Sequence, residues 1–142
     1  MLTKIFKLGI GWALLCCLGC NSAAPTFQMK HRDWLLVGFS NFSKAEMVAQ
    51  KIHLDMSPTM SKAHQYPLYI ANQKFYFHIE MKDHGRIKIL KLGDDAALST
   101  TDLGTALLAQ LPQFVKYEIK GQFLYLYDNQ GGVIKFVAAD WD

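Results

Sequence analysis

Residues 75–92 read FYFHIEMKDHGRIKILKL, and this stretch decides the kind of fold. From Phe75 to Lys82 apolar residues alternate with more polar ones, which predicts a strand with one face in the core and the other in water. Asp83-His84-Gly85 supplies turn chemistry, and Arg86–Leu92 returns as the partner strand. In this second strand the apolar positions slip from odd to even numbers, which predicts a β-bulge or a strand buried on both faces.

Short apolar runs and period-two alternation predict further strands before and after this hairpin. They cover residues 34–39, 51–56, 116–119, 123–127 and 133–137. One helix begins at the capping residues Ser99 to Thr101, continues with apolar residues at helical spacing, and ends at Pro112. About seven strands and one helix predict an α+β fold, in which a mostly antiparallel sheet curls into an open barrel and the helix packs on it.

The first twenty residues carry an export signal. Met1–Lys7 holds two lysines and no acidic residue, and Leu8–Gly19 is an uncharged, mostly apolar run of 12 residues. A helix needs roughly 20 such residues to span a bilayer, so the shorter run is typical of a secretory signal. Its end, Cys17-Leu18-Gly19-Cys20, resembles the lipobox of bacterial lipoproteins, although Cys17 stands where an aliphatic residue is usual.

The lipobox resemblance implies a division of the chain. Residues 1–19 are expected to be a signal peptide, Cys20 the lipidated N-terminus that carries diacylglyceryl and palmitate, and residues 20–33 a tether to the domain at 34–142. Two or more acyl chains hold a protein stably on a membrane. Asn21, in place of an aspartate, favours the outer membrane, with the domain facing the periplasm. An ordinary cleaved signal and an uncleaved anchor helix are the alternatives.

Several short motifs follow one another along the expected domain. They are Trp34-Leu35-Leu36, Asn72 with Phe75-Tyr76-Phe77, Thr101–Thr105, Tyr117–Gly121, Leu124–Leu126 and Gly131–Phe136. Their order resembles the META domain family, the HslJ-like envelope lipoproteins. Two cysteines of the family pattern are absent, since Ala71 and Thr105 stand at their positions. The resemblance implies a loose association with envelope stress and offers no catalytic residues.

Charge and cysteine content exclude several classes of function. The chain has 15 basic and 12 acidic residues, and without Lys4 and Lys7 of the leader it is nearly neutral. A nearly neutral domain lacks the excess of positive charge that binds the phosphates of a nucleic acid, so no nucleic-acid partner is expected. All three cysteines lie at or before Cys20, so we expect neither a disulfide nor a catalytic thiol in the domain.

Histidines and carboxylates suggest one metal site that is then disfavoured. His53 and His78 fall on the polar faces of two predicted strands, and if those strands were neighbours, Asp55 or Glu80 could complete the site. No His-x-His or His-x-x-x-His spacing occurs, so solvated histidines are the simpler interpretation. The pair Asp94-Asp95 is typical of a turn. With no nucleophile motif and no converging carboxylates, we expect no metal, no cofactor and no enzyme activity.

The aromatic residues leave two interpretations open. We expect five of them to fill the core: Phe75, Phe77, Phe123, Tyr125 and Phe136. They could instead line a barrel pocket for a small apolar ligand, which would make the protein a periplasmic binding module. The strand at 123–127 is apolar on both faces, so it is either covered by the helix or presents a face to a partner. Our leading prediction is a non-enzymatic, lipid-anchored envelope protein that acts through contacts with a partner protein.

Overall fold

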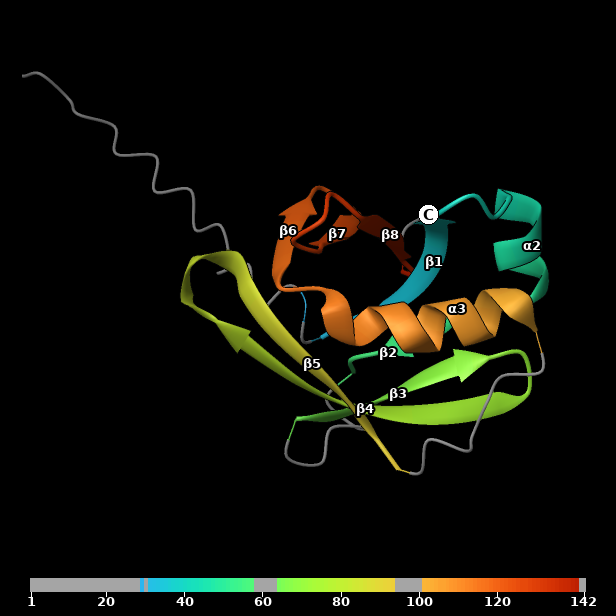
Figure 1. The fold of residues 1–142 in the computed structure, drawn as a ribbon, viewed down its shortest axis with the longest axis horizontal. Coiled ribbons are helices and arrows are strands. Elements are labelled where there is room, and N and C mark those ends of the chain that lie inside the picture. The colour runs from blue at the N-terminus through green and yellow to red at the C-terminus, as the bar shows by residue number, and fades with distance from the viewer. Residues whose placement is uncertain (1–28, 30, 58–63, 94–100, 141–142) are drawn as a thin grey trace, which may run out of the picture.

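The computed structural model describes residues 29, 31–57, 64–93 and 101–140. Eight strands follow one another around a closed barrel, and every pair of neighbours is antiparallel (Figure 1). The strands are β1 (Asp33–Phe39), β2 (His53–Asp55), β3 (Gln65–Ile70), β4 (Gln73–Lys82), β5 (Arg86–Leu92), β6 (Lys116–Lys120), β7 (Phe123–Tyr127) and β8 (Val133–Ala138). The barrel closes because β8 returns to pair with β1.

The antiparallel sheet with a helix packed on it is confirmed, whereas two details differ from the prediction. The barrel is closed, not open, and it has eight strands, not about seven. The strand that the sequence pattern did not reveal is β3, whose residues read QYPLYI. A proline inside such a run normally argues against a strand, because proline has no N–H to donate to a neighbour.

The position of Pro67 explains why β3 tolerates it. The N–H of Ile79 donates to the carbonyl of His64 at 2.9 Å. Because the bonding side alternates along an antiparallel strand, Pro67, opposite Tyr76, directs its nitrogen away from β4 and toward β2. The pairing of β3 with β2 does not extend past Leu68 to Pro67, so the missing N–H removes no hydrogen bond between these two strands.

The hairpin formed by β4 and β5 keeps an unbroken register from Tyr76↔Leu92 to Lys82↔Arg86. The predicted bulge or double burial in the second strand was wrong, because Leu90 lies on the outer side of the barrel with 44% of its surface exposed. A register shift occurs instead in β1, between Leu36 and Gly38, where that strand pairs with β8. There a Cβ on Gly38 would lie 3.2 Å from the Cβ of Lys135, so glycine allows the close approach.

Two α-helices, α2 and α3, lie entirely within the described residues. The predicted helix is α3 (Asp102–Gln110), capped by Thr101 and continued by a 3₁₀ turn, η2 (Leu111–Gln113), that contains the predicted terminator Pro112. The helix α2 (Lys44–Ala49) was not predicted. Its start is a capping box, in which Ser43 and Glu46 satisfy each other's backbone N–H groups.

Helix α3 lies across the seam where the barrel is joined most weakly. Strands β5 and β6 pair at one position, Arg86↔Lys116, and the N–H of Ile87 donates to the carbonyl of Val115 at 2.9 Å. Figure 1 shows α3 crossing the molecule between β5 and the strands on the opposite side. Its apolar face and that of η2 are buried in the common core. The helix therefore covers the part of the core that the short β5–β6 pairing does not enclose.

The interior of the barrel is filled by large apolar side chains. The largest of those that are fully buried are Trp34, Phe77, Phe114, Phe136, Met29, Leu36, Ile52, Leu54, Met56, Leu68, Ile70 and Ile79. Trp34 is oriented by its indole N–H, which donates to the carbonyl of Met29 at 3.0 Å. The chain just before β1 is therefore held against the end of the core at which β1 begins.

Candidate functional site

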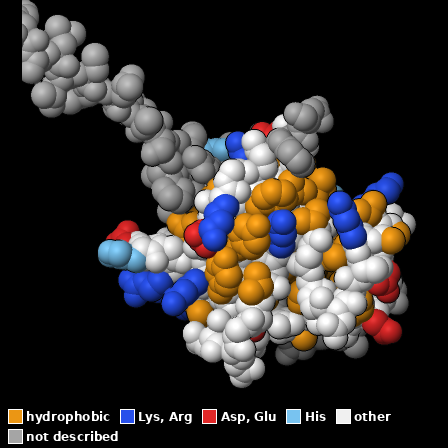
Figure 2. Space-filling model, turned by 90° about the horizontal axis from the view of Figure 1, so that it is seen from above, with side chains coloured by type: hydrophobic (Ala, Val, Ile, Leu, Met, Phe, Trp, Pro, Cys, Tyr) orange, Lys and Arg blue, Asp and Glu red, His pale blue; other side chains and the backbone are white. Residues whose placement is uncertain are grey.

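Three adjacent strands present apolar and aromatic side chains on the outside of the barrel, and we call this surface the aromatic face. Its members are Phe123, Tyr125 and Tyr127 of β7, Val133, Lys135 and Val137 of β8, and Leu35 and Val37 of β1. The register places Phe123 opposite Val137, Tyr125 opposite Lys135 and Tyr127 opposite Val133. Figure 2 views the molecule from above, the side of Figure 1 on which these strands lie, and shows hydrophobic side chains gathered there with Lys or Arg side chains among them.

The aromatic rings of β7 form a row along the strand. The ring centres of Phe123 and Tyr125 are 6.4 Å apart, and those of Tyr125 and Tyr127 are 6.3 Å apart. The ammonium of Lys135 lies 3.8 Å from the centre of the Phe123 ring and 5.5 Å from that of Tyr125. At these distances a cation is attracted to the ring face, so Lys135 is held over the row.

Strand β6 adds a charged rim beside this row. The ammonium of Lys120 lies 3.2 Å from a carboxylate oxygen of Glu118 and 5.7 Å from the ring centre of Tyr125. The hydrogen bond to Glu118 raises the pKa of Lys120, so this lysine remains charged at neutral pH. The same carboxylate accepts a hydrogen bond from the hydroxyl of Tyr127 at 3.2 Å. Glu118 is therefore engaged, and Lys135 has no carboxylate within ion-pair distance among the described residues.

An apolar groove continues the aromatic face toward α2. It has a volume of about 420 Å³, and its lining comes from β1, α2 and the start of β2. Leu35, Val37 and Val48 contribute its apolar wall, with Lys51 and His53 at the side. Leu35 and Val48 are 38% and 59% exposed, so an apolar side chain of another molecule could be buried here.

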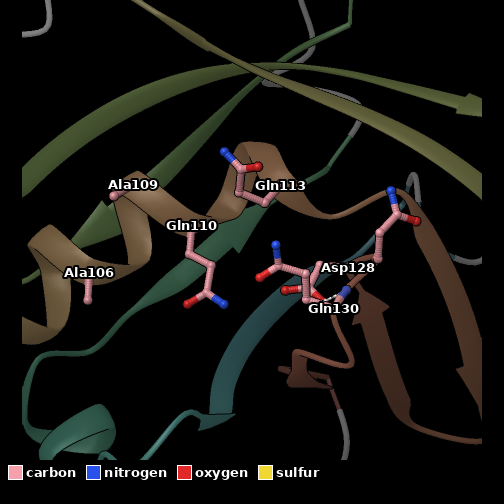
Figure 3. Close-up of a pocket in the computed structure, with 7 residues that line it drawn as sticks. Ala106, Ala109, Gln110, Gln113, Asp128 and Gln130 are labelled. Carbon is pink, nitrogen blue, oxygen red and sulfur yellow. Dashed lines mark hydrogen bonds between the residues drawn. The ribbon is translucent and has the colours of Figure 1, made fainter.

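A second hollow, of about 520 Å³, lies between α3 and the turn that joins β7 to β8 (Figure 3). Figure 3 shows Gln110 extending from the helix toward the turn that carries Asp128 and Gln130. The carboxylate of Asp128 accepts from the N–H groups of Gln130 at 2.8 Å and Gly132 at 2.6 Å, and these bonds lower its pKa. Because the turn uses this carboxylate, the hollow offers mainly neutral amide groups.

The two histidines of the candidate metal site do not come together. The missed strand β3 lies between β2, which carries His53, and β4, which carries His78. The His53 ring stacks on Tyr69, with 4.5 Å between ring centres, and His78 bonds to Glu80 at 2.9 Å. No group of three metal-binding side chains occurs within residues 29, 31–57, 64–93 and 101–140.

Two other predictions fall outside the described residues. The lipidation residue Cys20 lies there, together with the signal peptide and most of the tether, and so does the pair Asp94-Asp95. In the part of the chain that the structure describes, no helix is long and apolar enough to cross a membrane.

The prediction for the aromatic residues was right for three of the five and wrong for the other two. Phe75, Phe77 and Phe136 are buried in the core, whereas Phe123 and Tyr125 lie partly exposed on the outer side. Strand β7 therefore follows the second of the two interpretations left open for it: one side enters the core and the other forms a surface. Alternation alone could not separate the two sets, because both sides of β7 are apolar; in the structure Leu124 and Leu126 occupy its inner positions.

The comparisons with known proteins bear on the fold. No family model and no curated protein matches the chain. A crystal structure of a DUF4847 family protein from Bacteroides vulgatus is similar, with a TM-score of 0.61 at 10% identity over 80% of this chain and 96% of that one. An NMR structure of a protein from Burkholderia xenovorans has a TM-score of 0.60 at 16% identity, over 80% of this chain and 86% of that one. At such low identity, what this chain has in common with these two proteins is the fold.

Proposed function

We propose that this protein is a non-enzymatic, lipid-anchored envelope protein whose barrel binds a partner protein through the aromatic face. The leader at residues 1–19, followed directly by Cys20, supports the anchor, and Asn21 supports the outer membrane as its place. The META resemblance extends the proposal to a role in envelope stress. The single observation that carries the contact function is the aromatic row of β7, partly exposed and joined to an apolar groove.

The composition of the aromatic face defines the partner chemically. Its centre is apolar and aromatic, and its cations, Lys135 and Lys120, lie over the rings. A complementary surface would present apolar side chains at its centre and carboxylates opposite Lys135, the lysine with no carboxylate beside it. The groove between β1 and α2 would accept one projecting apolar side chain of the same partner.

The alternative function, a binding module for a small apolar ligand inside the barrel, finds less support. Trp34, Phe77, Phe114 and Phe136 occupy the interior and are each at most 1% exposed. Ligand cavities need a volume that side chains do not fill. The apolar surface of this protein that remains available to another molecule lies on the outside, which favours a macromolecular contact.

Metabolic labelling with radioactive palmitate tests the anchor. We expect the wild-type protein to incorporate label and the Cys20→Ser variant to incorporate none, because the thiol is the acylated group. The Cys17→Ser variant is the matched control and should still be labelled. Label that persists in Cys20→Ser would contradict the anchor.

Site-specific photocrosslinking in intact cells tests the contact surface. A photoreactive phenylalanine analogue at Tyr125 should give one discrete crosslinked protein, and the same analogue at Tyr76 or Leu90 should not. These two control positions are each 44% exposed but lie on β4 and β5. Lys135→Glu should abolish the product by reversing the charge at the centre of the face, whereas Lys74→Glu on β4 should not. Equal crosslinking from Tyr125 and Tyr76 would rule out the aromatic face as the specific surface.

A further inference from the structure

A row of three cations crosses three adjacent strands on another side of the barrel. Lys82 of β4 lies opposite Arg86 of β5, and Arg86 lies opposite Lys116 of β6. All three side chains are exposed. Directly opposite residues in a sheet have Cβ atoms about 5 Å apart, and like charges in such positions repel. We call these three residues the basic row.

Two of the carboxylates near the basic row bond to other residues. Glu80 bonds to His78 at 2.9 Å, and Glu118 pairs with Lys120 at 3.2 Å. Asp83, in the hairpin turn, bonds to the row through its backbone and not through its carboxylate, since its carbonyl accepts from the Nε of Arg86 at 3.3 Å. No ion pair of the described residues includes a member of the basic row. None of the three cations is therefore held in an ion pair with a carboxylate of the described residues.

The hairpin that carries two members of the row approaches β6 closely at its turn. Gly85 has φ +68°, and a Cβ at this position would lie 2.9 Å from the carbonyl oxygen of Tyr117. The hydrogen bond between Ile87 and Val115 fastens the other side of the turn. In the closed barrel these contacts bring Arg86 next to Lys116, so the three cations lie side by side without a ligand to order them.

The basic row lies at the end of the barrel where the tether enters. Antiparallel pairing places the start of β1, the end of β4 and the start of β5 at the same end. Met29 is fully buried, and it lies only nine positions after Cys20. Fully extended, nine residues reach about 30 Å, so an acylated Cys20 would keep this end of the barrel close to the lipid headgroups.

We propose that the basic row binds the phosphate groups of anionic phospholipids in the leaflet that holds the anchor. This inference rests on the proposed anchoring and adds an orientation: the β4–β5 hairpin faces the lipid. The aromatic face, which belongs to β7, β8 and β1, then remains accessible to a protein partner. Each Lys or Arg near an anionic surface contributes a similar increment of affinity, and three of them act together.

Vesicle sedimentation tests the proposal without any contribution from acyl chains. The chain from residue 20 to residue 142, with Cys20→Ser, is mixed with vesicles of phosphatidylethanolamine and phosphatidylglycerol, or of phosphatidylcholine alone. We expect binding to the anionic vesicles only, weakened by added salt. The triple variant Lys82→Gln, Arg86→Gln, Lys116→Gln should bind roughly 100-fold more weakly. Circular dichroism verifies that this variant is folded.

The matched control removes three cations from other places, as Lys44→Gln, Lys51→Gln, Lys74→Gln. It has the same net charge as the first triple variant and should bind within about twofold of the parent, because screening limits the reach of distant charges. Equal losses in the two triple variants, or no binding by the parent, would overturn the proposal. The first triple variant could also bind vesicles as the parent does but lose the protein that crosslinks to Tyr125 in cells. That result would assign the row to an acidic protein and would overturn the proposal. Palmitate labelling reports on the anchor separately, so either idea can fail alone.

Discussion

At the scale of single residues, a few positions are fixed by backbone geometry and not by side-chain chemistry. Gly85 and Gly121 both have positive φ, +68° and +59°. They differ in their surroundings, because a Cβ on Gly85 would lie 2.9 Å from the Tyr117 carbonyl, whereas nothing lies within 4 Å of one on Gly121. The pair therefore separates the cost of the left-handed conformation from the cost of a close approach.

We predict that Gly85→Ala destabilises the protein more than Gly121→Ala. The left-handed conformation alone costs about 1–2 kcal/mol for a residue with a Cβ, and Gly85→Ala adds a clash with backbone. The free energy of unfolding from urea titration measures both. Equal losses would mean that the hairpin moves away from β6 without cost.

Asp33 is a second residue with an unusual environment. Burial raises the pKa of its carboxyl, and Asp55, opposite it on β2, raises it further, while His53 acts in the other direction. One carboxylate oxygen, Oδ1, is buried without a hydrogen-bond partner. The folded state therefore binds a proton at this site more tightly than the unfolded chain does.

We predict that Asp33→Asn raises the melting temperature near pH 7. Because the pKa of Asp33 is raised in the folded state, its protonated form stabilises the protein at low pH, and this stabilisation is lost as the pH rises through that pKa. The neutral amide of asparagine does not ionise, so the variant avoids this loss. The gain should vanish near pH 3, below the ordinary value of 3.8, where the aspartic acid is itself neutral. Asp140→Asn is the control, because Asp140 is exposed and pairs with Arg32 at 3.8 Å. A gain that is independent of pH would show that charge is not the cause.

At the scale of elements, the start of α3 links the two helices. The hydroxyl of Thr101 accepts from the N–H of Gly104 at 3.1 Å and donates to the side chain of Gln50 at 2.7 Å. Gln50 is the C-cap of α2, so one side chain caps one helix and is bound to the end of the other. Since α3 covers the seam of the barrel, this cap supports more than its own helix.

We predict that Thr101→Ala lowers the free energy of unfolding by about 1–2 kcal/mol, because it removes the cap and the bond between the helices. Thr101→Ser keeps the hydroxyl and should recover most of the loss. Chemical denaturation of the three proteins measures the difference. A serine variant as unstable as the alanine variant would assign the effect to the lost methyl group.

At the scale of the whole molecule, the barrel is joined unevenly. Strand β5 pairs with β4 along its full length but with β6 at one position. Local opening requires the loss of few interactions where pairing is short. The β5–β6 seam is therefore the place where the closed barrel is expected to open first, with α3 moving away from it.

We predict that the amide of Ile87 exchanges with solvent faster than that of Phe77 in the middle of β4, although both side chains are at least 95% buried. The N–H of Ile87 belongs to the seam, whereas β4 has a strand on each side. Hydrogen exchange followed by NMR measures both rates. Leu107→Ala in α3 should accelerate Ile87 selectively. Equal protection in the wild-type protein would mean that the barrel opens only as a whole.

The sequence by itself determined most of the elements, because alternation and capping are local. Strands β5 and β7 have the predicted bounds, and α3 begins after the predicted cap. The export signal is likewise local, and it stays a prediction because residues 1–28 lie outside the described part. Strand β3 was missed because the cost of Pro67 depends on where its neighbour β2 stops, which no local pattern encodes.

Only the tertiary structure decided which strands are neighbours and which sides face outward. His53 and His78 are separated because β3 lies between their strands, and closure depends on β8 meeting β1, about a hundred residues away. Alternation shows that a strand has two sides, but in β7 both sides are apolar, so the pattern does not show which one is the surface. That choice follows from long-range pairing, which placed Leu124 and Leu126 in the core and left Phe123 and Tyr125 on the outside.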